Sequence, residues 1–194
     1  MGFKVIGTYL NGIVVVKGDI YRDERGFFTE VYRNDIFKSL GVASDFVQDN
    51  HSRSAKNVVR GLHFQFNPPM GKLIRATVGK IFLAAVDIRK GSPTLGKWYG
   101  QELEAGDGIQ VWEPKGFANG FCALSEWAEI QYKCTAVYNP KGESAIFWRD
   151  SDIGINWPLK DGLLSPKDAN AQLLSEWLKK PESDVFQYIQ EGKI

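Results

Sequence analysis

The sequence has few cysteines, little net charge and no long apolar run, and each shortage excludes a class of protein. Cys122 and Cys134 are the two cysteines among 194 residues, too few for a disulfide framework and wrongly spaced for a CxxC metal site. We expect both to be reduced core thiols. The 24 Lys and Arg residues balance 23 Asp and Glu residues, so no basic surplus favours nucleic acid or a membrane surface.

No apolar run approaches the roughly 20 residues that span a bilayer. Residues 1–10 also lack the apolar core of a signal peptide, so a cytoplasmic protein is expected. Histidine is scarce as well. His51 and His63 are the two candidates for any imidazole chemistry.

Glycine is in excess, at 20 of 194 positions, and it separates short runs rich in β-branched and aromatic residues. These runs alternate apolar and polar side chains, which is typical of a sandwich or barrel. In the last run Ile130, Tyr132 and Cys134 share one face, so Tyr132 is expected to point inward. The expected strands are residues 12–16, 72–78, 80–86, 108–112, 120–124 and 129–138.

Helical patterns are short and lie mainly near the C-terminus. Residues 34–40 fit one helix with Asn34 as its N-cap and Gly41 past its end. Near the C-terminus, apolar residues recur at helical spacing over residues 173–178, and Pro181 ends the run.

Ser183 or Asp184 is expected to cap a second short turn after Pro181. We therefore expect a β-rich domain over residues 1–170 and a helical extension over residues 171–194 packed on it.

A strand is predicted around His63, with His63 on one face and Arg60 and Leu62 on the other. Arg60, Lys72 and Arg75 place several cations near this histidine. Cations that converge on a concave β surface suit a phosphorylated substrate. At this point a structural histidine and a solvated charged face remain open alternatives.

Residues 108–119 resemble the second cupin motif, Gly-x5-Pro-x-Gly-x2-His, with Asn119 in the place of the histidine. The first cupin motif asks for His-x-His, and the sequence has His63-Phe-Gln65. Metal-dependent cupins bind their ion through three histidines and a glutamate, and imidazole suits such ions. The resemblance therefore implies a cupin barrel without a metal.

Further segments resemble, in order and spacing, the dTDP-4-dehydrorhamnose 3,5-epimerase family over about residues 3–170. The resemblance implies an all-β, cupin-type jelly-roll barrel with a few short, mainly C-terminal helices. The matching segments are residues 23–28, 46–52, 59–65, 71–75, 86–93, 114–121, 132–135, 152–159 and 165–168.

The family inverts C3 and C5 of a nucleotide-linked 4-keto-6-deoxy sugar without a cofactor or metal. Both carbons lie α to the ketone, so proton removal gives an enolate and protonation from the opposite face inverts the centre. The resemblance implies that His63 is the base and is held by Asp168. It also implies Tyr132 as the acid and Lys72 as the group that stabilises the enolate oxygen.

The resemblance also implies a nucleotide-sugar substrate and a homodimer, in which the segment around Arg25 and Glu30 reaches the partner's site. Phe28 and Tyr138 match aromatic positions that flank the thymine. The implied substrate-binding residues are Arg25, Phe28, Glu30, Gln48, Asn50, Arg60, Asn119 and Tyr138.

Asn119 is the main departure from the family, because most members carry a histidine there. An amide does not take a proton at neutral pH, so His63 is left as the base. His51 is assigned to a loop or to the rim of the substrate site. Two alternatives remain: an epimerase of C3 alone or C5 alone, acting on a related dTDP- or CDP-linked 4-keto-deoxysugar, and a non-catalytic sugar-nucleotide-binding cupin.

Overall fold

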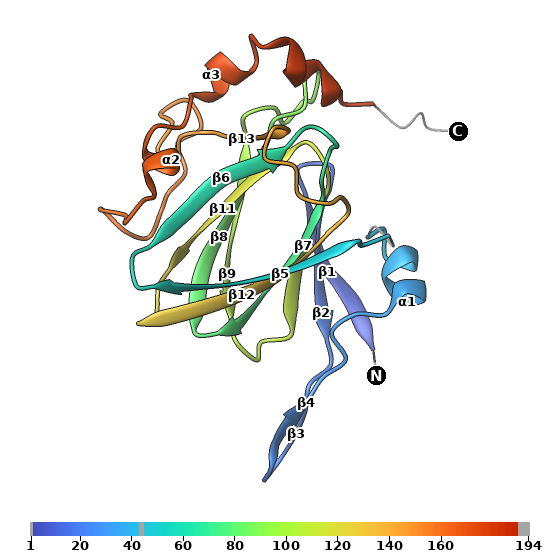
Figure 1. The fold of residues 1–194 in the computed structure, drawn as a ribbon. Helices are drawn as coiled ribbons and strands as arrows, with labels where there is room; N and C mark the ends of the chain where they lie inside the picture. Colours follow the sequence, from blue (N-terminus) through green and yellow to red (C-terminus); the bar gives the residue numbers. More distant parts are fainter. Residues whose placement is uncertain (1, 43–44, 190–194) are drawn as a thin grey trace.

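The computed structural model describes residues 2–42 and 45–189, which place two antiparallel sheets face to face (Figure 1). The six-stranded sheet consists, in spatial order, of β1 (Phe3–Tyr9), β2 (Ile13–Gly18), β10 (Ile109–Glu113), β7 (Lys72–Val78), β12 (Trp127–Cys134) and β5 (Gln48–Ala55). The five-stranded sheet consists of β13 (Glu143–Ala145), β6 (Val59–Gln65), β11 (Phe117–Ala123), β8 (Lys80–Asp87) and β9 (Trp98–Glu104). The expected all-β cupin-type jelly roll is confirmed.

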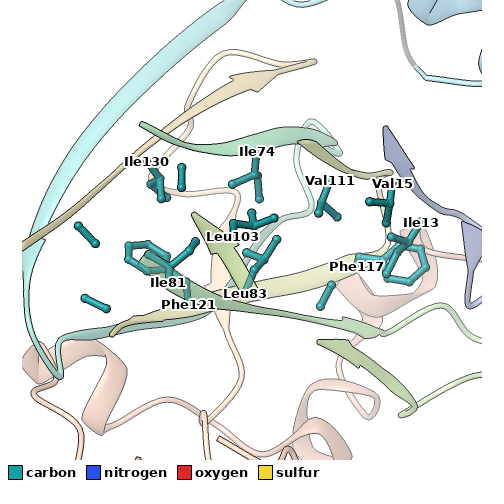
Figure 2. Packing of buried hydrophobic residues seen from close by; sticks show 14 residues of the cluster. Ile13, Val15, Ile74, Ile81, Leu83, Leu103, Val111, Phe117, Phe121 and Ile130 are labelled. Atoms are coloured by element: carbon teal, nitrogen blue, oxygen red, sulfur yellow. The ribbon is translucent and has the colours of Figure 1, made fainter. Parts of the chain in front are cut away.

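The space between the sheets is filled by the apolar residues that alternate along the strands (Figure 2). Ile74 of β7 and Val111 of β10 face Leu83 of β8 and Phe121 of β11 across this core. Burying each such side chain contributes about 1.5–3 kcal/mol, so this layer holds the sheets together. Lys72 comes two residues before Ile74 on the inward face of β7 and places a charge next to the apolar core.

Strand β6 carries one residue more than the part of β11 that it pairs with. The register joins His63 to Asn119 and Arg60 to Phe121, so three steps along β6 match two along β11. A bulge of this kind reverses side-chain parity, and it places Arg60 and His63 on the same face. The expectation that Arg60 shares a face with Leu62 is wrong. Leu62 packs in a separate apolar cluster, whereas Arg60 and His63 line one cavity.

Two glycines make this bulge possible. Gly61 has a φ of +123°, a conformation that L side chains rarely adopt. A Cβ atom at Gly61 would also lie 2.5 Å from the Cα atom of Gly120 on β11. The close approach of β6 and β11 therefore requires glycine at this position.

Helix α1 (Asn34–Ser39) differs from the expected helix at its start. Arg33 is the N-cap residue, with an extended φ of −146°, so the expectation of Asn34 as N-cap is wrong. Gly41 follows the helix with a φ of +79°, as expected. None of the helices formed by the described residues has the length and apolar character that crossing a membrane requires.

The C-terminal segment runs along the outer face of β6 and β13 (Figure 1). Trp177 is 1% exposed and packs edge to face on Phe64 of β6, with ring centroids 4.6 Å apart. Phe186 packs in the same apolar cluster. The segment contains α2 (Pro166–Ala169), α3 (Leu174–Trp177) and a 3-10 helix over Pro181–Val185.

The expected second turn, capped by Ser183 or Asp184, is wrong. The 3-10 helix begins at Pro181, and Lys180 is its N-cap residue. The domain boundary at residue 170 stays a prediction. Residues 190–194 of the expected extension, and residues 1 and 43–44 of the expected main domain, lie outside the described residues.

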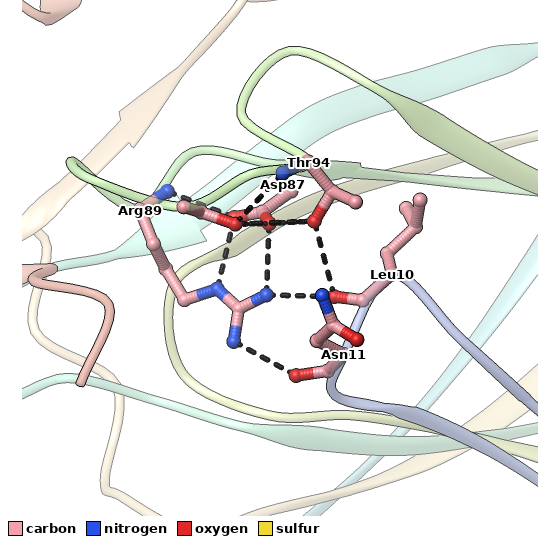
Figure 3. A network of polar contacts seen from close by, with 6 residues as sticks. Leu10, Asn11, Asp87, Arg89 and Thr94 are labelled. Carbon is pink, nitrogen blue, oxygen red and sulfur yellow. Dashed lines mark hydrogen bonds and ion pairs between the residues drawn. The ribbon is translucent and has the colours of Figure 1, made fainter. Parts of the chain in front are cut away.

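A buried ion pair joins the loop after β8 to the turn between β1 and β2 (Figure 3). Asp87 is fully buried and accepts hydrogen bonds from Arg89 Nε at 2.9 Å and from Thr94 Oγ1 at 2.6 Å. Arg89 also donates to the carbonyl oxygens of Leu10 at 2.7 Å and Asn11 at 3.1 Å. Burial raises the pKa of Asp87, but these donors outweigh burial and hold it below its usual range.

We expect Asp87→Asn to lower the free energy of unfolding at pH 7 by about 3–5 kcal/mol, because it leaves the guanidinium of Arg89 without its counter-charge. Urea unfolding measures this, with Asp35→Asn, an exposed partner of Arg33, as the control that stays near wild type. The pKa of Asp87 is lower in the folded protein than in the unfolded chain. The Asp87 carboxylate therefore stabilises the fold above about pH 4, and this stabilisation is lost as pH falls through the folded-state pKa. An unfolding midpoint of Asp87→Asn equal to that of Asp35→Asn contradicts this role.

Candidate active site

His63 and Asp168 form a hydrogen-bonded pair although 105 residues separate them in the sequence. The His63 Nε2 atom lies 2.5 Å from Oδ1 of Asp168. The side chain of His63 is 27% exposed and that of Asp168 is 4% exposed. The pair therefore has a shielded carboxylate behind a histidine that remains open to a cavity.

Helix α2 holds Asp168 in place. Ser165 is the N-cap residue, and its hydroxyl accepts a hydrogen bond from the Asp168 backbone N–H at 3.1 Å. Burial raises the pKa of Asp168, but the hydrogen bond and charge of His63, followed by Ser165, lower it below its usual range. Asp168 is thus a carboxylate at neutral pH, suited to orient the imidazole ring.

His63 opens into a cavity of about 180 Å³ between the two sheets. The five-stranded sheet contributes His63 and Arg60 from β6 and Asn119 from β11. The six-stranded sheet contributes Lys72 from β7 and Tyr132 from β12. Histidine and tyrosine therefore reach the same cavity from facing walls, and Tyr132 points inward as its parity predicts.

Lys72 and Asn119 bridge the two sheets inside this cavity. Lys72 Nζ donates a hydrogen bond to Asn119 Oδ1 at 2.6 Å and lies 5.9 Å from the centre of the Tyr132 ring. Burial lowers the pKa of Lys72, and the charge of Glu113 opposes that change. Burial also raises the pKa of Tyr132, so the phenol keeps its proton at neutral pH and is a competent donor.

A second hollow, of about 80 Å³, shares His63, Lys72 and Tyr132 with the first. Gln48 and Asn50 of β5 line it, joined by a hydrogen bond of 3.0 Å between their amides. The structure thus brings these predicted binding residues next to the predicted catalytic ones. Tyr138 also lines this hollow.

Arg25, Phe28 and Glu30 are not brought to this cavity. Arg25 and Phe28 lie in or beside the hairpin of β3 (Tyr21–Asp23) and β4 (Gly26–Phe28), which projects away from both sheets (Figure 1). The Arg25 side chain is 83% exposed and pairs with Asp23 of the same hairpin. Within one chain, these predicted binding residues have no access to His63.

His51 lies on the outer side of the six-stranded sheet, in β5, so its expected place in a loop is wrong. Its Nε2 atom lies 2.8 Å from Oε2 of Glu129.

The amide nitrogen of Gln65 donates hydrogen bonds to the carbonyl oxygens of Pro68 and Val137, at 3.0 and 3.1 Å. Across residues 2–42 and 45–189, no group of three or more His, Cys, Asp and Glu side chains is placed to hold a metal ion.

The sequence patterns did not predict a place in this site for three polar residues that the structure brings to it. Ser52 lines the larger cavity with a buried hydroxyl, and Glu143 lines the smaller one and accepts from Tyr138 at 2.8 Å. Glu113 is buried at the end of β10 beside Lys72. Strand parity could have placed Glu113 inward with Val111, but Ser52 and Glu143 lie in polar segments with no apolar alternation to orient them.

The family model for dTDP-4-dehydrorhamnose 3,5-epimerase matches residues 7–176. The enzyme of that name from Salmonella typhimurium is 50% identical over 177 residues, which cover 90% of this chain and 97% of the relative. The Neisseria gonorrhoeae enzyme is also 50% identical, over 84% of this chain, and the chain spans half of that relative's length.

A crystal structure of the dTDP-6-deoxy-D-glucose-3,5-epimerase from Legionella pneumophila, in complex with dTDP-4-keto-L-rhamnose, has a TM-score of 0.90 and 43% identity. The match covers 97% of this chain and all of the Legionella chain. The similarity in sequence and the similarity in fold therefore agree over nearly the whole chain. The chain belongs to the dTDP-4-dehydrorhamnose 3,5-epimerase family, a family of isomerases.

Proposed function

We propose that this protein inverts C3 and C5 of dTDP-4-dehydro-6-deoxy-D-glucose and so forms dTDP-4-dehydro-L-rhamnose. The observation that supports this best is the placement of His63, bonded to Asp168, and Tyr132 on facing walls of one cavity. Inversion at carbon needs this arrangement, because one proton leaves from one face and another arrives on the opposite face.

His63 is the proposed base. Because Nε2 is bonded to Asp168, the neutral ring donates its N–H to the carboxylate and keeps the lone pair of Nδ1 for the substrate proton. The C–H bond breaks, its electron pair forms the enolate, and the proton moves to Nδ1. Tyr132 then gives its hydroxyl proton to the same carbon from the other side, and solvent resets both residues.

Lys72 stabilises the enolate oxygen in this scheme. Its ammonium group is already held by Asn119, so little reorganisation is needed when negative charge develops. Neither proton step changes an oxidation state, and Lys72 supplies the positive charge. The proposal therefore includes no cofactor and no metal.

The nucleotide is proposed to bind across the two hollows that meet at His63, with Arg60 in the larger one and Gln48, Asn50 and Tyr138 in the smaller one. Arg60 suits the diphosphate, since a guanidinium forms paired hydrogen bonds with phosphate oxygens. The projecting hairpin supplies Arg25 and Phe28, and the segment that follows it supplies Glu30, to the cavity of a second copy in a homodimer. This accounts for the distance of the hairpin from its own chain's cavity.

Asn119 supports a second candidate, inversion of one carbon alone. Its amide stands directly opposite His63 in the register of β6 and β11, where it accepts from Lys72 and cannot act as a base. One histidine must then serve both carbons. Incubation with dTDP-4-dehydro-6-deoxy-D-glucose in D2O distinguishes the two candidates: deuterium at C3 and C5 supports the 3,5-epimerase, and deuterium at one carbon supports the second candidate.

We expect His63→Ala to lower deuterium incorporation at both carbons by about 10²–10⁴-fold, because no second imidazole lines the described cavity. Asp168→Asn is expected to keep the fold and to slow exchange strongly, since an amide does not hold the ring in the required tautomer. His51→Ala is the matched control and stays near wild type, because His51 pairs with Glu129 outside the cavity. Near-normal exchange in His63→Ala would rule out the single-base scheme.

Tyr132→Phe is expected to separate exchange from inversion. His63 still removes and returns a proton on its own face, so deuterium enters C3 or C5 with the original configuration. Proton NMR of the sugar coupling constants reports the configuration, and mass spectrometry reports the deuterium. Full inversion by Tyr132→Phe would mean that another group delivers the second proton.

The shared site predicts complementation between subunits. Arg25→Ala and His63→Ala homodimers are each impaired, but a heterodimer unites an intact His63 cavity with an intact Arg25 hairpin. After subunit exchange at equal amounts, about a quarter of wild-type sites are restored, as a closed two-fold dimer requires. Activity at low substrate concentration measures the recovery. A mixture no more active than the sum of its parents would place Arg25 in its own chain's site.

A further inference from the structure

Glu113 is a buried carboxyl group that the proposed reaction does not use. It is the last residue of β10 and is 2% exposed. In the part of the chain that the structure describes, neither of its carboxyl oxygens has a hydrogen-bond partner. A carboxylate buried in this way is costly unless a nearby charge compensates it, so its surroundings indicate its role.

The register of the sheet places Glu113 beside Lys72. The two residues stand directly opposite each other in the antiparallel pair of β10 and β7, where Cβ atoms lie about 4.5–5.5 Å apart. Val111 and Ile74, two residues away on the same strands, point into the core between the sheets. Glu113 and Lys72 therefore point into the same end of the interior.

Glu113 is the group best placed to balance an ammonium at Lys72. The hydrogen bond that Lys72 donates goes to the neutral amide of Asn119. Glu143 is engaged by Lys167 at 2.6 Å, and burial raises the pKa of the Cys134 thiol, which keeps it neutral. The charged and titratable groups around Lys72 are Glu113, Cys134, Glu143, Lys167, Tyr132, His63 and Arg60. Those around Glu113 are Lys72 and Tyr99.

Burial acts on the two groups in opposite directions. It raises the pKa of Glu113 to about 8 and lowers the pKa of Lys72. The charge of Glu113 in turn raises the pKa of Lys72. Ionisation of Glu113 in the alkaline range thus helps Lys72 to keep its proton in that same range.

We propose that Glu113 is a positioning residue whose carboxylate keeps Lys72 in its ammonium form, so that Lys72 remains a donor to the enolate oxygen as pH rises. The inference rests on the proposed function for the role of Lys72 in the reaction. The electrostatic link between Glu113 and Lys72 is independent of the substrate. No bond is made or broken at Glu113 in this role.

Glu113→Gln tests the link, because the amide keeps the shape and removes the charge, and Glu113→Asp restores a charge. NMR titration of the Lys72 side chain in the substrate-free dimer, assigned by the signal missing in Lys72→Met, gives its pKa directly. We expect that pKa to fall by about one unit or more in Glu113→Gln and to recover in Glu113→Asp. An unchanged pKa of Lys72 in Glu113→Gln overturns the proposal.

The alkaline limb of kcat/KM is expected to move to lower pH by about the same amount in Glu113→Gln. A limb that stays in place while the pKa of Lys72 moves would overturn the catalytic part of the proposal. Wild-type protein without epimerase activity, but with the expected change in the pKa of Lys72, would refute the proposed function and leave the electrostatic link supported.

Thermal unfolding separates this role from a structural one. The folded-state pKa of Glu113 is raised, so its burial makes the fold less stable as pH rises from about 4 towards that value. Glu113→Gln removes this loss, and we expect it to melt above wild type at pH 9. The melting temperature of Glu113→Gln relative to wild type is therefore expected to rise between about pH 4 and pH 9. A difference that stays the same at every pH would contradict the ionisation of Glu113 in the folded protein and, with it, the proposal.

Discussion

The parity of side chains along β6 is the constraint on which the site depends. One extra residue, at the close approach of Gly61 to Gly120, turns Arg60 to the same side as His63. Leu62 then faces outward, where the apolar cluster of the C-terminal segment covers it. Strand β6 thus presents polar side chains to the cavity and apolar side chains to the C-terminal segment. That segment includes α2, the helix that carries Asp168, the partner of His63.

Regular alternation was sufficient to predict much of the fold from the sequence. The strand expected at residues 72–78 agrees in both bounds with β7, and Tyr132 points inward as its neighbours Ile130 and Cys134 require. Strands β5 and β9 were missed because Gln48–Ala55 is almost entirely polar and Trp98–Glu104 has a single buried residue. Such strands are held by their neighbours in the sheet, which a local pattern does not report.

Local sequence patterns predict less of the site than of the fold. The pairing of His63 with Asp168 came from a family resemblance, since no periodicity links residues 105 positions apart. Strict alternation of side chains along β6 predicted the wrong face for Arg60, because a bulge depends on the register between two paired strands. Glu113 lies one residue beyond the strand expected at residues 108–112, and its burial opposite Lys72 was therefore not predicted, although parity with Val111 places it inward.

Polar groups gather at one end of an interior that is otherwise apolar, and this arrangement costs stability. The interior is useful for enolate chemistry because charges act more strongly there than in water and need little reorganisation. An amide at position 119 holds Lys72 without adding a charge or a second base. The electrostatic balance of the cavity then depends on Lys72, on Glu113 and on the histidine–aspartate pair. A substitution at Lys72 or at Glu113 therefore changes the protonation of the other, so these two residues are best treated as one coupled titrating pair.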